Sequence, residues 1–360
     1  MGGASAPMLF APIAAIRHKS IGAEAPPTTA ARGRWLQQSL LLRYASPSFT
    51  NAGKEPHVTI GEYSQIYRGK RVVEFRMGAT PAGGDVVYRL TQDYDSEESQ
   101  RALLDDFLSK VDPAELETLI VGAWSEAHDE GPQGYIDALI EYRARLPKLT
   151  ALFFGDMTYE DCEISWITQT SYNPLLAAFP QLRSLRIRGS TSLELQAFSH
   201  DALEELAIEC GGLPSKIVDA VAGSTLPALK HLELWLGSDN YGFDGGLAPY
   251  QNLLAKIGPE RLRYLGLRDS EISDEAAVWL AQQPWLGSLQ TLDLSLGTIG
   301  DVGAQALAES PNLGALERID LSHHYISEAW QAKLRALPCQ VVLDDPEEED
   351  DGDRYVAVSE

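Results

Sequence analysis

Hydrophobic residues return along most of the chain in one short pattern. The motif L-x-x-L-x-L, with Ile, Val or Phe in place of some leucines, occurs eight times, and its copies begin 33, 33, 21, 26, 33, 27 and 27 residues apart. The copies begin at Leu116, Leu149, Leu182, Leu203, Leu229, Leu262, Leu289 and Leu316. A unit that recurs at such intervals is typical of a solenoid, in which each unit packs only against its neighbours.

The motif predicts a short strand whose two faces differ. Alternate side chains of a strand point to opposite faces, so the second and third hydrophobic residues of each copy face a core and the residues between them face solvent. The copy at 289–307 also shows the return segment, in which Ile299, Val302 and Leu307 are expected to bury a helix against the strand. Stacked units of this kind predict an α/β solenoid, a horseshoe with a parallel sheet along its concave side.

A different pattern precedes the repeats, in residues 57–112. Residues 72–75 and 86–90 are short apolar runs separated by glycine and proline, and we expect them to pair as a β-hairpin. The apolar spacing of residues 103–111 predicts a helix that ends before Pro113. A hairpin and one helix are small for independent stability, so we expect a cap over the first repeat. The domain of about eight repeats then spans 113–343, and an acidic tail follows at 344–360.

The first 56 residues differ from the rest in charge. They hold six basic and two acidic residues, a balance of +4, whereas the whole chain has a formal net charge of -23. They are rich in Ala, Pro, Ser and Thr, with one possible short helix at 35–44. We expect a mostly disordered extension, and a basic arm that docks on the acidic remainder is the alternative.

The composition of the whole chain narrows the classes of function. Its 52 acidic residues against 29 basic ones oppose nonspecific binding to nucleic acid. No apolar run approaches the roughly 20 residues of a membrane span. The three cysteines are far apart and odd in number, which fits neither a disulfide framework nor a CxxC metal site and favours a reducing compartment. We therefore expect a cytoplasmic monomer with no cofactor and no metal.

The later positions of the unit resemble the ribonuclease-inhibitor-like subtype of leucine-rich repeats, L-x-x-L-x-L-x-x-N-x-L-x-x-x-G-x-x-x-L. Ile299, Gly303 and Leu307 occupy the last three of those positions in one copy. The copy before it keeps Ile272 and Leu280. The asparagine position departs from the subtype, and it holds Ser270, Gly297 and His324.

Residues 57–360 are also similar to a family of bacterial, cytosolic leucine-rich-repeat proteins. The similar segments are Gly-Asp at 155–156 with Glu-Ile-Ser-Trp-Ile at 163–167, Leu-Arg-Ser-Leu-Arg-Ile-Arg-Gly at 182–189, His-Leu-Glu-Leu-Trp-Leu-Gly at 231–237, Asp-Leu-Ser-Leu-Gly at 293–297 and Asp-Arg-Tyr-Val-Ala-Val-Ser-Glu at 353–360. The resemblance implies a fold and carries no activity.

The strand positions that alternate with the leucines predict a binding surface on the concave side. Trp, Tyr and Arg are enriched at the hot spots of protein interfaces, so we expect a polypeptide partner there, with Trp235 as an exposed anchor. An ordinary solvated sheet with cross-strand ion pairs is the alternative. The candidate residues are Arg186, Arg188, Glu209, His231, Glu233, Trp235, Tyr264, Arg268, Asp269 and Asp293.

No catalytic motif accompanies this surface, and we expect a non-catalytic scaffold. The alternative function is a small-molecule-binding or enzymatic accessory protein that uses the insertions at 156–173 and 237–251, with a pocket near Asp156, Cys210 and Asp269. The acidic first insertion lacks the order of a calcium loop, which favours a loop packed by its aromatic residues. Cys210 is expected to be a small, half-buried thiol.

Overall fold

The computed structural model describes residues 60–314 and 316–358. Contacts divide the chain between residues 54 and 55, and the described residues lie in the second part. The predicted disorder of residues 1–56 and the possible helix at 35–44 lie outside the described residues.

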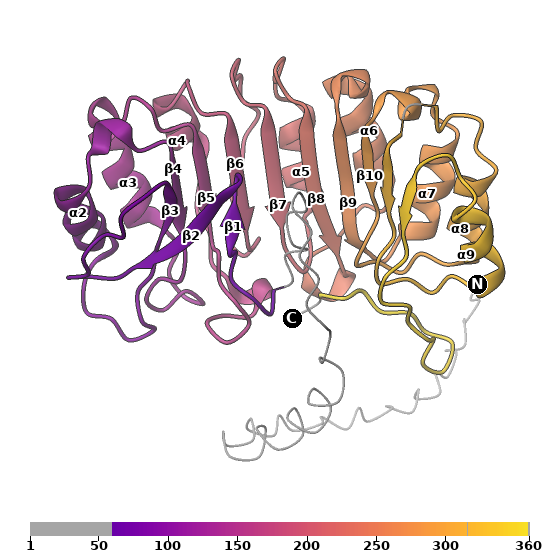
Figure 1. Cartoon of the computed structure of the whole chain (residues 1–360), viewed down its shortest axis with the longest axis horizontal. Helices are drawn as coiled ribbons and strands as arrows, with labels where there is room; N and C mark the ends of the chain where they lie inside the picture. Colours follow the sequence, from indigo (N-terminus) through magenta and orange to yellow (C-terminus); the bar gives the residue numbers. More distant parts are fainter. Residues whose placement is uncertain (1–59, 315, 359–360) are drawn as a thin grey trace, which may run out of the picture. The chain divides into compact units, whose positions relative to one another are not determined.

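One sheet contains the twelve strands of the described chain, in chain order (Figure 1). Every neighbouring pair is parallel except β1 and β2. The strands are β1 (Ile66–Tyr67), β2 (Lys70–Phe75), β3 (Val86–Leu90), β4 (Thr118–Val121), β5 (Ala151–Phe154), β6 (Ser184–Arg188), β7 (Glu205–Glu209), β8 (His231–Gly237), β9 (Tyr264–Ser270), β10 (Thr291–Asp293), β11 (Arg318–Asp320) and β12 (Gln340–Val342).

Helices alternate with the strands and pack on one face of the sheet, and we call the opposite face the concave face. Buried residues of α5, such as Ile217 and Val218, belong to the same hydrophobic core as the leucines of the strands. The helices are α2 (Gln100–Lys110), α3 (Gln133–Tyr142), α4 (Asn173–Ala178), α5 (Ser215–Ala222), α6 (Ala248–Ile257), α7 (Ser273–Ala281), α8 (Asp301–Ala308) and α9 (Glu328–Leu334). The architecture is a leucine-rich-repeat solenoid.

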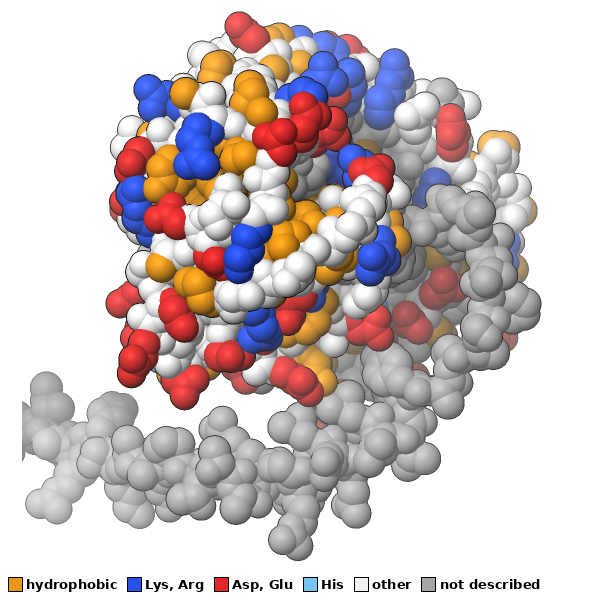
Figure 2. Space-filling model, turned by 60° about the vertical axis from the view of Figure 1, so that its left-hand side comes forward, with side chains coloured by type: hydrophobic (Ala, Val, Ile, Leu, Met, Phe, Trp, Pro, Cys, Tyr) orange, Lys and Arg blue, Asp and Glu red, His pale blue; other side chains and the backbone are white. Residues whose placement is uncertain are grey.

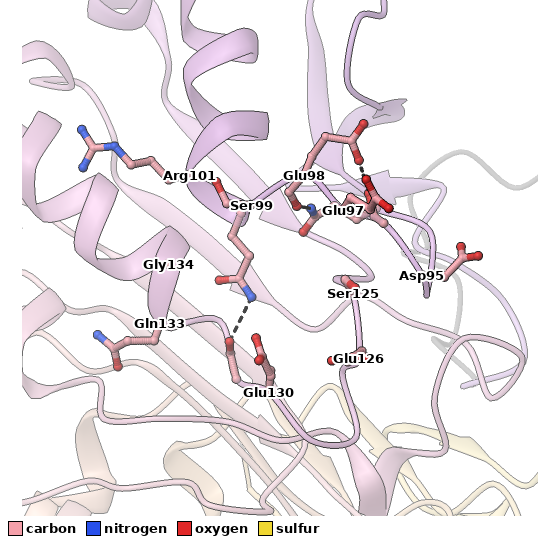
Figure 3. A pocket seen from close by; sticks show the side chains of 14 residues that line it. Asp95, Glu97, Glu98, Ser99, Arg101, Ser125, Glu126, Glu130, Gln133 and Gly134 are labelled. Carbon is pink, nitrogen blue, oxygen red and sulfur yellow. Dashed lines mark hydrogen bonds between the residues drawn. The ribbon is translucent and has the colours of Figure 1, made fainter.

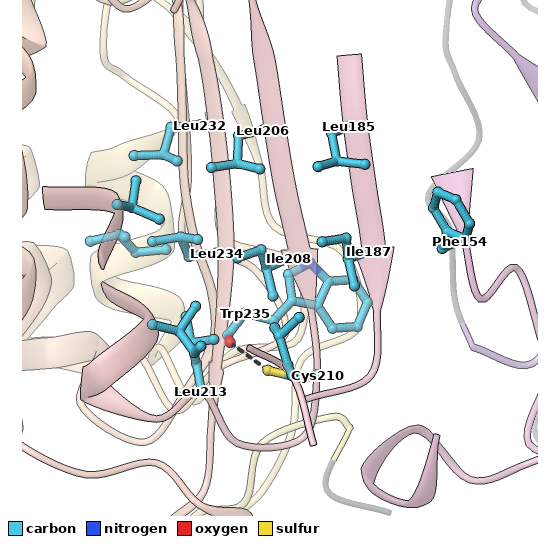
Figure 4. Packing of buried hydrophobic residues seen from close by; sticks show 14 of the residues in the cluster. Phe154, Leu185, Ile187, Leu206, Ile208, Cys210, Leu213, Leu232, Leu234 and Trp235 are labelled. Atoms are coloured by element: carbon cyan, nitrogen blue, oxygen red, sulfur yellow. Dashed lines mark hydrogen bonds between the residues drawn. The ribbon is translucent and has the colours of Figure 1, made fainter. Parts of the chain in front are cut away.

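The predicted register of the repeats is confirmed. The middle hydrophobic residues of all eight copies are paired from strand to strand in one row, from Leu119 in β4 to Ile319 in β11. Leu292, in the seventh copy, is 0% exposed. Figure 4 shows two such rows side by side, with Leu185, Leu206 and Leu232 in one and Ile187, Ile208 and Leu234 in the other.

The return segment of the copy at 289–307 is partly as predicted. Ile299 and Leu307 are buried, but Val302 is 62% exposed, so its predicted burial is wrong. The helix α8 begins only at Asp301 and buries Gly303, Ala304 and Leu307. That set of positions places residue 302 on the outer side of the helix.

The predicted hairpin between residues 72–75 and 86–90 is wrong in its direction. These runs form β2 and β3, and the two strands pair in parallel. The intervening loop returns the chain before β3 begins, and it is held by bonds to its carbonyl oxygens from Tyr88 and Lys110. A hairpin does exist one strand earlier, where β1 and β2 pair across Arg68–Gly69, both with positive φ. The strand-return-strand topology therefore extends into the predicted cap.

Candidate functional site

The concave face of the repeats is organised in three rows of side chains that run across the strands. Register partners define the rows. The first row, at the start of the strands, contains Ser184, Glu205, His231, Tyr264, Thr291 and Arg318. The second row contains Arg186, Ala207, Glu233, Gly266, Asp293 and Asp320. The third row contains Arg188, Glu209, Trp235 and Arg268.

The first row remains partly open to solvent. His231 and Tyr264, on neighbouring strands, stack face to face, with ring centroids 3.9 Å apart and planes inclined by 2°. The side chain of His231 is 30% exposed. The hydroxyl of Tyr264 donates to Asp293 Oδ2 over 2.8 Å, which fixes the tilt of the ring from below. The result is a rigid aromatic pair at the centre of the accessible row.

Exposed charged residues border this row on its outer side. Arg183, Lys230 and Arg263 immediately precede first-row residues in the sequence, and all three are exposed. Glu204 lies between the first two, with 3.8 Å from Arg183 Nη1 to its carboxylate and 3.6 Å from Lys230 Nζ. Such exposed pairs contribute little to stability and leave the side chains available.

The second and third rows form a buried network of alternating charge. Arg188 Nε donates to Glu209 Oε2 over 2.7 Å, and both residues are 0% exposed. Arg186 bridges Glu209 and Glu233, with 3.1 Å to the latter. Arg268 continues the network to β10 by pairing with both Glu233, at 2.9 Å, and Asp293, at 3.5 Å. Cross-strand ion pairs, the predicted alternative, therefore account for most of the candidate residues.

Glu233 occupies the centre of this network. Burial alone would raise the pKa of its carboxyl, but Arg186 and Arg268 hold that pKa well below its usual range. The indole nitrogen of Trp235 also donates to Glu233 Oε1, over 2.8 Å. His231 Nε2 also lies 3.5 Å from Glu233 Oε2. Glu233 is therefore a charged acceptor shared by four neighbours, which is the arrangement that makes a buried charge tolerable.

The expectation that Trp235 is exposed is wrong. Trp235 is 0% exposed and belongs to the main hydrophobic core (Figure 4). The guanidinium of Arg268 lies over its ring at 5.0 Å from the centroid. The third row lies deepest along the strands, so its largest member is enclosed by the chain's own side chains.

Asp269 is not part of the concave rows, although it was predicted to share their surface. It is buried at the end of β9 and has a positive φ of 50°. Its Oδ1 accepts the backbone N–H of Val358 over 2.9 Å. Burial raises the pKa of this carboxyl well above its usual range. Asp269 therefore anchors the end of the described chain.

That anchor is one of several contacts that hold residues 354–358 across neighbouring repeats, and Arg354 adds an ion pair with Asp274. Leu296 and His323 lie just after β10 and β11, at places that correspond to that of Asp269 at the end of β9. Like Asp269, both have a positive φ. The Leu296 carbonyl accepts from the N–H of Ala357 over 2.8 Å, and His323 Nε2 donates to the Tyr355 carbonyl over 3.0 Å. This part of the acidic tail therefore folds back on the repeats.

The first insertion differs from its prediction. Tyr159 and Trp166 are 49% and 57% exposed, so these two aromatic residues do not pack the loop, whereas Tyr172 near its end is buried. Met157, Ile164 and Ile167 are buried in their place. The acidic residues of the loop bind other protein groups: Asp156 accepts from Ser64 and pairs with Arg89 over 3.2 Å. Within the described part of the chain, no three His, Cys, Asp or Glu side chains converge in a way that could hold a metal ion.

The residues proposed for an enzymatic pocket are closed to solvent. Asp156, Cys210 and Asp269 are each 0% exposed. Cys210 is thus fully buried and not half-buried as predicted. Burial raises the pKa of its thiol to about 12, so the thiol is protonated at neutral pH. A cleft of about 740 Å³ lies elsewhere, at the N-terminal ends of α2 and α3, where acidic side chains such as Glu98 and Glu126 line it (Figure 3).

The outer surface of the N-terminal side of this part is mixed in charge. Figure 2 shows acidic and basic side chains interspersed there, with hydrophobic side chains between them. Among residues 60–314 and 316–358, no helix is both long and apolar enough to cross a membrane.

Sequence comparison gives two family matches. Residues 288–308 match a family model described as "Leucine Rich repeat", and residues 1–32 match one described as "Family of unknown function (DUF6053)". No curated protein matches the sequence. The two family matches lie on opposite sides of the division between residues 54 and 55.

A solved structure supports the fold over a longer stretch. The chain is similar to a protein from Bacteroides fragilis whose crystal structure is known, with 29% sequence identity and a TM-score of 0.66. The similarity covers 72% of this chain and 73% of that one. Together with the family match, it identifies the described part of the chain as a leucine-rich-repeat solenoid, a fold that generally mediates protein–protein interaction.

Proposed function

We propose that the leucine-rich-repeat domain is a non-catalytic scaffold that binds a polypeptide partner along the first row of its concave face. The observation that carries this proposal is the stacked pair of His231 and Tyr264. It is a preformed aromatic surface, partly open to solvent, on two adjacent strands of a rigid sheet. Aromatic groups that need no ordering on binding are favoured as interface anchors.

The residues around this pair have different roles. Arg183, Lys230 and Arg263 precede the first row as an exposed charged rim, which would steer association. The buried network orients the pair from beneath, since Tyr264 is bonded to Asp293 and Asp293 to Arg268. We therefore place binding in His231, Tyr264 and the rim, and structural support in Arg188, Glu209, Glu233, Trp235 and Arg268.

We also propose a cytoplasmic location. The described cysteines are unpaired, which supports a reducing compartment. An enzymatic role at the insertions gains no support from the geometry, because the three groups it would use are buried.

Affinity capture from the native cell, followed by binding measurements with the captured partner, tests the proposal. Tyr264→Ala should weaken the complex by about 2 kcal/mol or more, because it removes the larger half of the stacked pair. Tyr264→Phe keeps the ring and loses only the bond to Asp293, so its binding should stay within about threefold of that of the wild type.

Tyr94→Ala is the matched control, because Tyr94 is 58% exposed and lies outside the concave rows. It should bind as the wild type does. If Tyr264→Ala and His231→Ala both keep wild-type affinity while their unfolding midpoints show an intact fold, the first row is not the binding surface.

A further inference from the structure

The tip of the β1–β2 hairpin lies on the concave face. Tyr67 is buried, with its ring centroid 5.8 Å from that of Phe153 in β5. Together with Val87 and Ile120 these rings form a small hydrophobic cluster that is separate from the main core. Figure 1 shows β1 and the beginning of β2 crossing in front of the neighbouring parallel strands.

Polar contacts extend from this tip to strands far along the chain. The hydroxyl of Tyr67 is 3.5 Å from Ser184 Oγ in β6. Arg68 Nη1 is 3.0 Å from Glu205 Oε2 in β7. Before the hairpin, Ser64 donates from both its N–H and its hydroxyl to Asp156 Oδ1. Residues 63–68 thus contact the sheet as an extended peptide bound across it would.

The tip ends where the accessible part of the first row begins. Ser184 and Glu205 are themselves first-row residues, and Ser184, beside Tyr67, is 0% exposed. Glu205 retains 18% exposure, and its register partner His231 on β8 retains 30%. The hairpin and a partner seated on His231 and Tyr264 would therefore occupy adjacent segments of one continuous row.

The attachment of residues 63–68 consists of Tyr67, the Arg68–Glu205 pair and the bonds that Tyr63 and Ser64 donate to Asp161 and Asp156. Tyr67 is its one large buried side chain among the described residues of the segment, since Ile66 points away and is 39% exposed. The Arg68–Glu205 pair is itself partly exposed. Because the cluster around Tyr67 is separate from the leucine core, lifting the tip would leave that core closed. Segments with so few buried contacts open locally without global unfolding.

We propose that residues 63–68 are an intramolecular ligand of the concave face, and that the partner displaces them with an extended segment in which an aromatic residue precedes a basic one. The inference rests on the proposed function and specifies its partner. Phe153 and Ser184 receive the ring and its polar end, and Glu205 receives the basic group. A partner that extends along the first row from His231 to Glu205 and Ser184 then has to compete with the chain's own tip.

A fluorescent peptide with the sequence of residues 60–69 tests this in the full-length chain. The variant Tyr67→Ala/Arg68→Glu weakens the internal contacts, so it should bind the peptide at least about tenfold more tightly than the wild type does. A peptide carrying the same two substitutions should not bind it. Ile66→Ala is the matched control, because its side chain faces solvent, and it should bind the peptide no better than the wild type does.

Equal binding of the peptide to the wild type and the double variant, or no binding to either, would overturn the proposal. If the double variant does not fold, hydrogen exchange of the wild type decides. If the amides of residues 63–68 exchange faster than those of β5 and β6, the result supports displacement. If the amides of all three segments exchange only by global unfolding, the result refutes it. None of these readouts uses the captured partner, so a failure here leaves the test of Tyr264 untouched.

Discussion

The first and third rows of the concave face lie on the same strands, four residues apart, but they differ in exposure to solvent. His231 in the first row is 30% exposed, whereas Trp235 in the third row of the same strand is 0% exposed. Both residues alternate with the leucines along β8, so a concave position does not by itself give exposure. Position along the strand decides which residues can meet a partner and which support the sheet.

Substitution of Trp235 should give the largest loss of stability and the clearest test of the difference between the two rows. Trp235→Ala should lower the free energy of unfolding by about 3 to 5 kcal/mol, because it leaves a cavity and removes a donor to Glu233. The first-row substitution His231→Ala should change it by less than about 1 kcal/mol. Urea denaturation of both variants measures the difference. Equal losses would mean that the two rows do not differ in their structural role.

Substitutions in the charge network of the second and third rows should reduce stability almost as much. Arg188→Met removes the buried cation and leaves Glu209 with Arg186 alone, so unfolding should become easier by about 3 kcal/mol. The double variant Arg188→Met/Glu209→Gln should regain part of that loss, since no unpaired carboxylate then remains. Denaturation midpoints of the single and double variants report the coupling. A double variant that loses the sum of the two single effects would contradict a direct pair.

The smallest of the three effects depends on pH and concerns Asp269, outside the rows. Because the pKa of Asp269 is raised in the folded state, the folded chain keeps a proton that the unfolded chain releases, and stability falls as pH rises above about 4. Asp269→Asn keeps an oxygen for the N–H of Val358 and removes this titration. Between about pH 5 and 7 the variant should gain about 1 to 2 kcal/mol relative to the wild type. Parallel pH profiles of the two proteins would contradict a buried, protonated carboxyl.

The leucine ladder was predictable because its determinants are local. Each copy of the motif specifies one strand, and register follows once copies stack, so Leu119 and Ile319 fall in one row although 200 residues separate them. The candidate surface was predictable only as a set of positions. The sequence placed Glu233 and Trp235 correctly on the concave side, but their burial depends on Arg186 and Arg268 from other strands.

The contacts made by the two ends of the described chain could not be predicted from the repeat pattern. Tyr67 reaches Phe153, and Val358 reaches Asp269, over separations that no repeat period sets. A partial signal for the hairpin was the Arg68–Gly69 pair, since glycine with positive φ is typical of a tight turn. For the exposed Trp166 no pattern was available, because the insertion has no counterpart in neighbouring copies.

The contacts of the hairpin tip have a consequence for the order of events on the ribosome. Arg68 and Glu205 are 137 residues apart, so at about 5 to 20 residues per second the tip waits on the order of ten seconds for β7 to emerge. Tyr67 likewise meets the hydroxyl of Ser184 only after a further 117 residues have been added, while the growing chain presents an uncovered concave face. During synthesis the concave face is therefore open to other chains, because the tip that later covers part of it is not yet bound.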